Sequence, residues 1–416
     1  MGRRFGGARI EHGPPGPAHV YVARRAHCGI ITAGDRRRSG PNTATTILAV
    51  RGLVLPIAEL DPRSIEAWRS LATRVSEPNP FFEADFVMAA ARHLGQQGVS
   101  LLVAADGHEW RGCLPVRRRL GWRRLPGRWL VGWRHVYAFL GTPLLEASAE
   151  LPALEAMLAA GDRLGPQLLA LEWLGGDGPA AAALAEACAR RGGAGPIYEA
   201  FERASIDRRP EATYLDGLSS SRRKELRRLS RRLDEQVDGG VATVDRAGSP
   251  AAVDGFLTLE RSGWKGQAGT AMSSDPAHAR FLHEVCATFA SAGRLELLAL
   301  EGGGRTLAMQ CNLLAGGCLF SFKVAHDEAY GRYSPGVQLE LAAIEAFHAR
   351  DAATRMDSCA DPGNELINRL WPDRVALFTA AVPLGPHALR PALRAGLRAH
   401  RRLALSPRAA VRLPRR

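Results

Sequence analysis

Long apolar runs are absent from the sequence. No stretch of the 416 residues approaches the roughly 20 consecutive apolar residues that a helix needs to cross a bilayer. The first forty residues are rich in arginine, glycine and proline, and they contain no apolar segment like that of a secretory signal. We therefore expect a cytoplasmic protein without a transmembrane segment.

Cysteine is scarce and scattered. The chain contains seven cysteines, an odd number, and no two of them form a C-x-x-C pair. Such a pattern indicates neither a disulfide framework nor a zinc site. We expect a reducing environment and no bound metal.

Acidic residues are missing from one end of the chain and rare at the other. Residues 384–416 contain nine arginines and no acid, and residues 1–40 contain eight arginines with only Glu11 and Asp35. These two segments account for more than the net charge of +13, so residues 41–383 are close to neutral. Basic tails favour solubility or loose contact with anionic surfaces over sequence-specific reading of nucleic acid. Peripheral contact with a membrane through the tails is therefore one expectation.

The hydrophobic pattern divides the chain into two similar parts. A chain of this length is expected to form two to three domains. Residues 47–205 and 210–384 each follow the order helix, helix, hairpin, strand, helix, strand, helix, strand. We predict a mixed α/β protein built from two tandem units, each with a mixed central sheet flanked by helices. Residues 1–46 are predicted to be a disordered basic tail.

Arginine-rich segments lie at the margins of this pattern. Residues 117–128 are predicted to form a loop, and residues 129–140 a strand. The basic C-terminal tail, residues 385–416, has leucines at helical spacing. A terminal helix, a membrane-surface helix and disorder are all compatible with that composition.

The most informative stretch of the sequence follows residue 317. Cys318–Val324 is an apolar run typical of a buried strand, and Ser334, Pro335 and Gly336 begin a periodic helix. Serine is a preferred N-cap and proline suits the first helical position. Because free amides at a helix start attract anions, this start is a candidate anion site. An ordinary solvated loop is an equally good interpretation. The polar side chains of the segment are Lys323, His326, Asp327, Glu328, Tyr330 and Arg332.

A basic helix is predicted to begin after Ser219-Ser220-Ser221 and to end near Gln236. A solvated, charge-rich face is the commonest explanation of such a helix, and binding of a polyanionic donor or acceptor is the alternative. Its basic residues are Arg222, Arg223, Lys224, Arg227, Arg228, Arg231 and Arg232.

Short motifs in the second half resemble those of one protein family. The segments are LSSSRRKELRRLSRRL (218–233), ERSGWKG (260–266), AMQCNLL (308–314), FSFKVAHDEAYGRYSPG (320–336) and MDSC (356–359). They resemble the GNAT-like acetyltransferase domain of CelD-type proteins of cellulose and exopolysaccharide biosynthesis. That group is itself similar to the FemAB-type aminoacyltransferases, which contain two GNAT-like units. The resemblance extends over residues 210–375, and over residues 50–205 it concerns only the order of elements.

The resemblance implies an N- or O-acyltransferase, most simply an N-acetyltransferase. Its donor would be acetyl-CoA or another acyl-CoA, and its acceptor a sugar or polysaccharide precursor in exopolysaccharide or envelope synthesis. Besides the catalytic candidates given next, His326 is a weaker candidate for the base that deprotonates the acceptor. The catalytic candidates are Asp327, Tyr330 and Asp357. The candidates for donor binding are Lys323, Arg332, Ser334, Gly336 and Val337. The candidates for substrate binding are Trp264, Lys265, Arg223 and Arg227.

Two departures from the family pattern keep the donor and the general acid open. GNAT enzymes usually cradle the donor pyrophosphate with a Q/R-x-x-G-x-G/A loop, whereas Arg332 is followed by one glycine, Gly336, at a different spacing. Residues 364–371 contain no tyrosine, a residue that often serves as general acid in that helix. An aminoacyl-tRNA donor, as in FemAB-type enzymes, is therefore one alternative. A non-catalytic accessory module of a polysaccharide synthase is the other.

Overall fold

The computed structural model describes residues 50–95, 97–165, 167–193, 196–209, 218–349 and 351–404. The predicted tail at residues 1–46 and the last part of the C-terminal tail, residues 405–416, lie outside these ranges. The boundaries predicted for the two units stay predictions.

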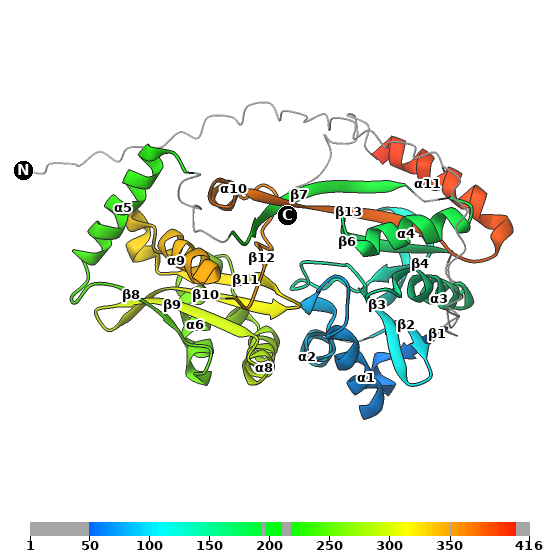
Figure 1. The fold of residues 1–416 in the computed structure, drawn as a ribbon, viewed down its shortest axis with the longest axis horizontal. Helices are drawn as coiled ribbons and strands as arrows, with labels where there is room; N and C mark the ends of the chain where they lie inside the picture. The colour runs from blue at the N-terminus through cyan, green and yellow to red at the C-terminus, as the bar shows by residue number, and fades with distance from the viewer. Residues whose placement is uncertain are drawn as a thin grey trace, which may run out of the picture. The chain divides into compact units, whose positions relative to one another are not determined.

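The first half follows the predicted order of elements (Figure 1). Proline occupies the first positions of α1 and α4, where its missing N–H costs no hydrogen bond. The elements are β1 (Arg51–Pro56), α1 (Pro62–Ala72), α2 (Ala84–Leu94), β2 (Val99–Asp106), β3 (Glu109–Trp122), β4 (Leu125–Gly132), β5 (Leu144–Leu145), α3 (Glu150–Arg163), β6 (Leu168–Gly175), α4 (Pro179–Arg190) and β7 (Ile197–Asp207).

The second half repeats this order after an additional basic helix. Proline again begins α6 and α8. The elements are α5 (Ser220–Asp234), β8 (Ala242–Asp245), α6 (Pro250–Ser262), α7 (Trp264–Gln267), α8 (Pro276–Ser291), β9 (Leu295–Gly302), β10 (Arg305–Ala315), β11 (Cys318–His326), the 3-10 helix η5 (Glu328–Tyr333), α9 (Pro335–Ala349), β12 (Arg355–Asp357), α10 (Glu365–Leu370), β13 (Asp373–Pro383) and α11 (Arg390–Ala404).

The arginine-rich segment at residues 117–128 is not the predicted loop. β3 and β4 pair from Val116 and Gly132 out to Trp122 and Leu125, so the segment forms the end of a long hairpin. The loop prediction is wrong because the charges of this segment are exposed side chains on paired strands. The strand predicted over residues 129–140 is also too long, since β4 ends at Gly132.

The described strands join into one 13-stranded sheet. Its order is β1-β2-β3-β4-β6-β13-β7-β12-β11-β10-β9-β8, with β5 paired to β3 outside this path. β4 pairs in parallel with β6, and β11 pairs in parallel with β12, whereas the other neighbours are antiparallel. Each half therefore places one parallel pair at the same point of its order, which is the duplication that the sequence predicts.

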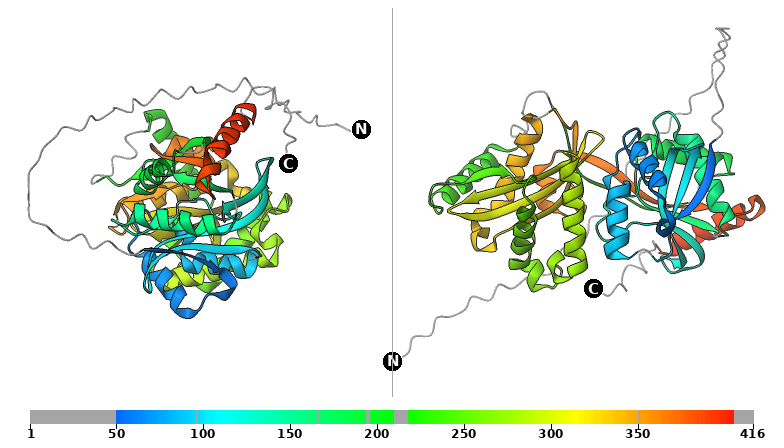
Figure 2. Two further views of the ribbon diagram at one scale, coloured as in Figure 1. Left: turned by 90° about the vertical axis from the view of Figure 1, so that its right-hand side faces the viewer. Right: turned by 90° about the horizontal axis from the view of Figure 1, so that it is seen from below.

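The two halves exchange their last strands. β13, from the end of the second half, pairs with β6 and β7 of the first half. β7, from the end of the first half, pairs with β12 of the second half. The long strands β7 and β13 run side by side through the middle of the sheet (Figures 1 and 2). Because of this exchange, each half completes the sheet of the other.

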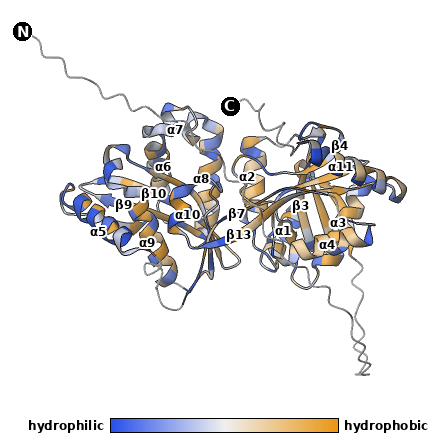
Figure 3. Cartoon of the chain, turned by 90° about the horizontal axis from the view of Figure 1, so that it is seen from above, coloured by the Kyte–Doolittle hydropathy of each residue, from blue (hydrophilic) through white to orange (hydrophobic). Residues whose placement is uncertain are grey.

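Helices cover both faces of the sheet in the second half. α5 and α9 lie on one face of β8–β11, and α6 and α8 lie on the other (Figure 1). Phe256 and Phe281, from α6 and α8, share a buried cluster with Phe320 of β11. Hydrophobic residues follow the interior strands and the inner helix faces (Figure 3). These packed faces hold β11 between two helix layers.

The C-terminal tail contributes a helix to the first half. Leu393 and Leu397 of α11 pack in a cluster with Trp129 and Tyr198, and the Tyr198 hydroxyl donates to the Leu397 carbonyl at 3.1 Å. Of the three states compatible with the sequence, residues 390–404 thus adopt a terminal helix packed on the sheet. Within the described ranges, no helix combines the length and apolarity required to span a membrane.

Candidate active site

The candidate site begins where the parallel strands β11 and β12 separate. They pair only from Cys318 with Arg355 to Phe320 with Asp357. β11 continues to His326, and among the described strands only β10 pairs with this continuation. One edge of residues 321–326 is therefore unpaired by any described strand and offers backbone groups to a ligand.

A β-bulge sets the direction of Lys323 in β11. Asn312 pairs with Ser321 and Cys311 with Lys323, so two residues of β11 oppose one residue of β10. A bulge of this kind breaks the alternation of side chains along a strand. As a result, Lys323 lies close to the ring of the adjacent Phe322, 5.8 Å from its centre.

The ammonium group of Lys323 has aromatic neighbours instead of an ionic partner. Its Nζ lies 4.5 Å from the centre of the Tyr137 ring and 5.8 Å from that of Phe139. Within the described ranges, Nζ makes neither a hydrogen bond nor an ion pair. Burial lowers the pKa of Lys323 to about 8, and the nearby charge of Lys265 acts in the same direction. The group is thus poised to exchange a proton near neutral pH.

Glu260, which is buried, and the partly exposed Lys265 form an ion pair beside the unpaired edge. The Lys265 ammonium donates to Glu260 Oε1 at 2.9 Å and to the Val324 carbonyl at 3.3 Å. Glu260 Oε2 accepts the Met272 N–H at 2.8 Å. Since the N–H and C=O of one strand residue point to the same side, Val324 also directs its N–H toward this edge. The backbone of Val324 at this edge can therefore bind a polar group, as its carbonyl already binds the Lys265 ammonium.

A small, open hollow lies against this edge. Trp264 at its rim is 59% exposed, and its backbone N–H donates to the carboxylate of Glu328. The structure therefore brings Trp264 and Lys265 to the end of the strand that carries Lys323. The lining residues are Leu259, Glu260, Gly263, Trp264, Lys265, Val324, Ala325, His326 and Glu328.

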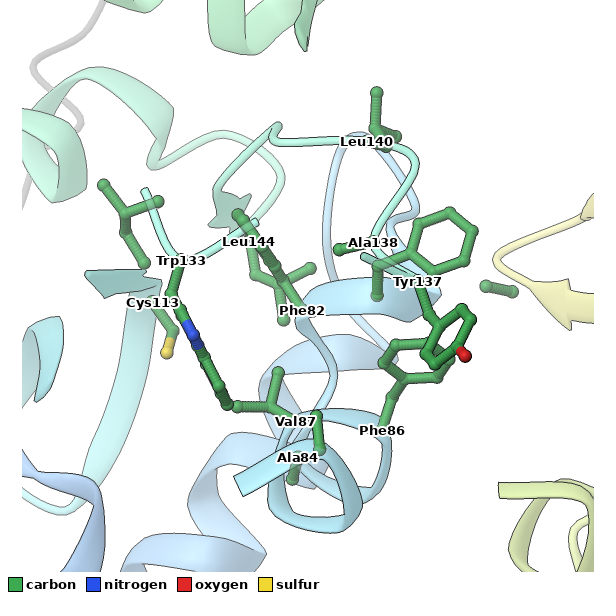
Figure 4. Close-up of a cluster of buried hydrophobic side chains, with 14 of the residues drawn as sticks. Phe82, Ala84, Phe86, Val87, Cys113, Trp133, Tyr137, Ala138, Leu140 and Leu144 are labelled. Atoms are coloured by element: carbon green, nitrogen blue, oxygen red, sulfur yellow. The ribbon is translucent and has the colours of Figure 1, made fainter. Parts of the chain in front are cut away.

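The first half supplies the aromatic side of the site through the segment after β4. Trp133, Ala138 and Leu140 are anchored in a buried cluster, and Tyr137 extends from this segment beside Phe86 (Figure 4). The Tyr137 ring stacks on Phe281 with centroids 5.3 Å apart. This segment takes the place that a strand-to-helix turn occupies after β11 in the second half.

Tyr137 and His278 are site residues that sequence reasoning missed. The Tyr137 hydroxyl lies 2.8 Å from His278 Nδ1. Burial raises the pKa of Tyr137, and the negative charges of Glu260 and Asp275 add to this effect, so the phenol stays protonated. No motif or spacing links residues 137 and 278, because tertiary packing alone brings them together.

Asp357 lies in a buried ion pair between the halves. Its Oδ2 accepts Arg203 Nη2 at 2.6 Å, and its Oδ1 accepts the Cys359 N–H at 3.0 Å. Arg203 also donates to the Phe139 carbonyl, which holds the aromatic segment next to β12. With both oxygens engaged, this geometry favours a positioning role for Asp357 over the predicted role of base.

Asp327 and Tyr330 hold the loop that follows β11. Asp327 Oδ1 accepts the Ala329 N–H at 2.9 Å and so caps η5. Tyr330 packs, partly buried, against the cluster that contains Leu233 and Val237. Neither residue lines the hollow beside Lys323, and their catalytic roles stay predictions.

The start of α9 differs from the predicted N-cap. Ser334 adopts a left-handed conformation, with φ 54° and ψ 55°, whereas an N-cap residue is extended. Its carbonyl accepts the N–H groups of Val337 and Gln338 at 3.0 and 3.1 Å. The serine cap was expected from residue type, but the preceding 3-10 turn fixes the backbone instead. The amide of Gly336 has no backbone partner within the described ranges, which leaves one free donor at this helix start.

Other predicted donor-binding residues surround this helix start. A side chain at Gly336 would meet the His326 imidazole at 3.5 Å, so the two residues are adjacent. Val337 is buried in the core of the second half. Arg332 lies over the Tyr333 ring at 4.7 Å, and its Nη2 is 3.5 Å from Gln236 Oε1 at the end of the basic helix.

The predicted substrate-binding residues fall into two places. Trp264 and Lys265 belong to the hollow beside β11, on the α6 side of the sheet. Arg223 and Arg227 of α5 line a separate groove with Gln338, in the first turn of α9. These two arginines are therefore closer to the helix start than to the hollow, and they fit a role in donor binding.

Comparison with known proteins supports the fold of this site. Residues 220–365 match a protein family described as "Acetyltransferase (GNAT) domain". No curated protein matches the sequence. Among the described residues, no group of three or more His, Cys, Asp and Glu side chains is arranged to hold a metal ion.

Solved structures share this architecture at low sequence identity. FemX has a TM-score of 0.52 and 8% identity over 79% of this chain and 98% of FemX. A conserved protein of unknown function from Bacteroides thetaiotaomicron VPI-5482 has a TM-score of 0.50 and 10% identity over 76% of this chain and 97% of that chain. A tandem GNAT protein from the clavulanic acid biosynthesis pathway has a TM-score of 0.41 and 13% identity over 81% and 99%. Residues 220–365 thus have the GNAT-like acyltransferase fold that the sequence predicts, and FemX shares the architecture of the chain.

Proposed function

We propose that the chain transfers an acyl group from a phosphate-bearing donor to an amine or hydroxyl group, and that its second half carries the reaction. The observation that carries this proposal is Lys323, a largely buried ammonium group without an ionic partner beside the unpaired edge of β11. The match of residues 220–365 to an acetyltransferase domain supports the same half.

The donor is proposed to lie along the unpaired edge of β11. An extended ligand arm can hydrogen-bond to the backbone of Val324 as an added strand would. Its phosphates would then lie toward the start of α9, where the free amide of Gly336 and the guanidinium of Arg332 provide positive potential. An acyl-CoA, such as acetyl-CoA, combines such an arm with phosphates.

Lys323 is proposed to act on the reacting carbonyl. Attack by the acceptor places negative charge on the carbonyl oxygen, and a cation held in a largely buried site stabilises that charge. The ammonium then donates its proton to the departing sulfur, and the amine regains a proton from the acceptor nitrogen. A pKa of about 8 suits both proton transfers near neutral pH.

The acceptor is proposed to enter past Trp264 and Lys265. The exposed indole offers an apolar face, and Glu260 and Lys265 add polar groups next to it. A sugar or polysaccharide precursor, which the motif resemblance implies, is the proposed acceptor. Roles in exopolysaccharide or cellulose synthesis and a cytoplasmic location are parts of this same proposal.

An aminoacyl-tRNA donor is the second candidate. The groove that Arg223 and Arg227 line reaches the first turn of α9, so a polyanion bound along α5 would arrive at the proposed phosphate position. The motif resemblance to FemAB-type enzymes supports the same donor. A non-catalytic module is the third candidate, and it predicts no turnover with any donor.

The test is a transfer assay with the full chain. Purified protein is incubated with acetyl-CoA and either glucosamine or UDP-glucosamine, and acetylated product is measured by mass spectrometry. We expect product with wild type and a loss of a hundredfold or more with Lys323→Met. Donor binding, measured by thermal shift with acetyl-CoA, is expected to survive this change.

Three outcomes would overturn the proposal. If Lys323→Met turns over as fast as wild type, Lys323 takes no part in the chemical step. A thermal shift with charged tRNA but none with acetyl-CoA would establish the second candidate. If both wild type and Lys323→Met bind acetyl-CoA but neither acetylates glucosamine or UDP-glucosamine, the non-catalytic accessory module is favoured.

A further inference from the structure

The β3–β4 hairpin and α11 bring many arginines together on the first half. Residues 117–128 contain six arginines, α11 contains five, and neither segment contains an acid. Trp122 and Trp129 of the hairpin share a buried cluster with Leu397 of α11, and α11 lies close to β4 (Figure 3). Two segments far apart in the sequence thus form one basic region, which we call the arginine surface.

Most charges of the arginine surface are not neutralised by the protein. Arg123 pairs with Glu199, and Arg390 pairs with Asp162. The guanidinium groups of the remaining exposed members form no hydrogen bond or ion pair within the described ranges. A concentration of like charge destabilises the free protein through repulsion, and an anionic partner relieves it. These members are Arg118, Arg119, Arg124, Arg128, Arg398, Arg401 and Arg402.

An apolar side chain extends from the same surface. Leu120 lies near the tip of the hairpin, pairs across the strands with Arg128 and is 92% exposed. Its neighbours in sequence, Arg118 and Arg119, are exposed as well. A leucine surrounded by arginines matches the boundary of a bilayer, where the apolar group enters the acyl region and the guanidinium groups meet lipid phosphates.

We propose that the arginine surface docks the protein on an anionic lipid bilayer, with Leu120 inserted among the lipids. A nucleic acid is the other common partner of an arginine-rich surface. Proteins that bind single-stranded nucleic acid stack the bases on exposed aromatic rings. Here both tryptophans of the hairpin are buried, and the exposed apolar group is aliphatic. The observations therefore favour the bilayer, and this inference does not depend on the proposed transfer reaction.

Vesicle flotation with the full chain tests this surface. The probes are vesicles of phosphatidylcholine with 30% phosphatidylglycerol and vesicles of phosphatidylcholine alone. We expect wild type to bind the anionic vesicles, more weakly at high salt, and not the neutral ones. Arg118→Gln, Arg119→Gln and Arg124→Gln together should weaken partition roughly a hundredfold, and Leu120→Ser about tenfold.

A matched control and a competing ligand make the test decisive. Arg63→Gln, Arg261→Gln and Arg305→Gln remove three exposed arginines outside the surface and should change partition only slightly. Unchanged melting temperatures verify that all variants fold. If the hairpin variants bind the anionic vesicles as wild type does, the hairpin and Leu120 do not contact the bilayer and the proposal is overturned. Binding of tRNA that is lost in the arginine variant but kept in Leu120→Ser, without vesicle binding, would overturn it in favour of nucleic acid.

Discussion

The ammonium group of Lys323 lies 4.5 Å from the centre of the Tyr137 ring, and the two residues come from different halves of the chain. Tyr137 follows β4, whereas Lys323 lies in β11. The candidate site is therefore complete only when both halves are present. A change in the first half is expected to alter the pKa and position of a lysine in the second.

The pH dependence of transfer should report the ionisation of Lys323. Its pKa is about 8 and its charged form is the proposed active form, so kcat is expected to fall as the pH rises through about 8. Arginine stays charged over this range, and Lys323→Arg should lose that decline while retaining some activity. The measurement is kcat against pH for both proteins. A decline near pH 8 that persists in the arginine variant would assign it to another group.

The ring of Tyr137 should matter more than its hydroxyl. Tyr137→Leu removes the cation–π contact, which contributes about 1–2 kcal/mol at a desolvated site, and the pKa of Lys323 should fall by about one unit. Tyr137→Phe keeps the ring and loses only the hydrogen bond to His278. In this variant the decline of kcat with rising pH should therefore stay near pH 8. Tyr198→Phe is the control, since the Tyr198 ring packs with Trp122 and Trp129 in another cluster. Equal shifts in all three variants would contradict a specific contact.

The ion pair between Arg203 and Asp357 should be sensitive to loss of either partner. Both side chains are almost fully buried, at 1% and 6% side-chain exposure, so Asp357→Asn or Arg203→Met leaves an uncompensated group and should cost about 3–5 kcal/mol. The double variant should cost less than the sum. Urea unfolding at pH 7 gives these values. Glu365→Gln, which removes an exposed pair with Arg369, should cost under about 1 kcal/mol.

Glu340 should make stability depend on pH. Burial raises its pKa to about 7, although its Oε1 accepts Trp371 Nε1 at 2.9 Å. A carboxyl group with a raised folded-state pKa stabilises the fold at low pH, and this contribution is lost as the pH rises through about 7. Glu340→Gln should therefore change the free energy of unfolding little at pH 5 and raise it by about 2 kcal/mol at pH 8.5. An equal effect at both pH values would show that ionisation of Glu340 is not responsible.

The salt dependence of donor binding should separate the two donors. Each phosphate contact in a polyanion complex contributes about 0.7–0.9 to the slope of log affinity against log salt. With acetyl-CoA as donor, changing Arg223, Arg227 and Arg231 together to Gln should leave a shallow slope. If tRNA is the donor, wild type should show a steep slope that flattens in the triple variant. Fluorescence anisotropy with labelled tRNA, and calorimetry with acetyl-CoA, give the slopes.

The sequence predicted the helices and strands better than it predicted the contacts between them. Hydrophobic period and proline positions located the helices and strands of both halves, because these signals act within a few residues. The arginines of residues 117–128 misled the prediction, since a charge on an exposed strand face looks like a charge in a loop. Ser334 misled it as well, because the 3-10 turn before α9 overrides the preference of serine for a cap.

The candidate site was only partly predictable. Lys323, Trp264 and Lys265 were proposed from their motifs, and the structure places Trp264 and Lys265 beside the strand end that carries Lys323, although their roles stay predictions. The ring under Lys323 was not found, since it depends on a contact across 186 positions of sequence between Tyr137 and Lys323. The bulge that turns Lys323 was hidden too, because its cause is the pairing with β10.

The exchange of β7 and β13 has a consequence for synthesis of the chain. A ribosome makes the first half long before β13 emerges, so β6 and β7 must wait for a strand encoded near the end. Until then, the edge of β6 is open to other chains, and pairing across so long an interval is slow. We expect nascent chains that stop before residue 373 to aggregate or to recruit chaperones, and release of the completed chain to be the moment at which the sheet closes.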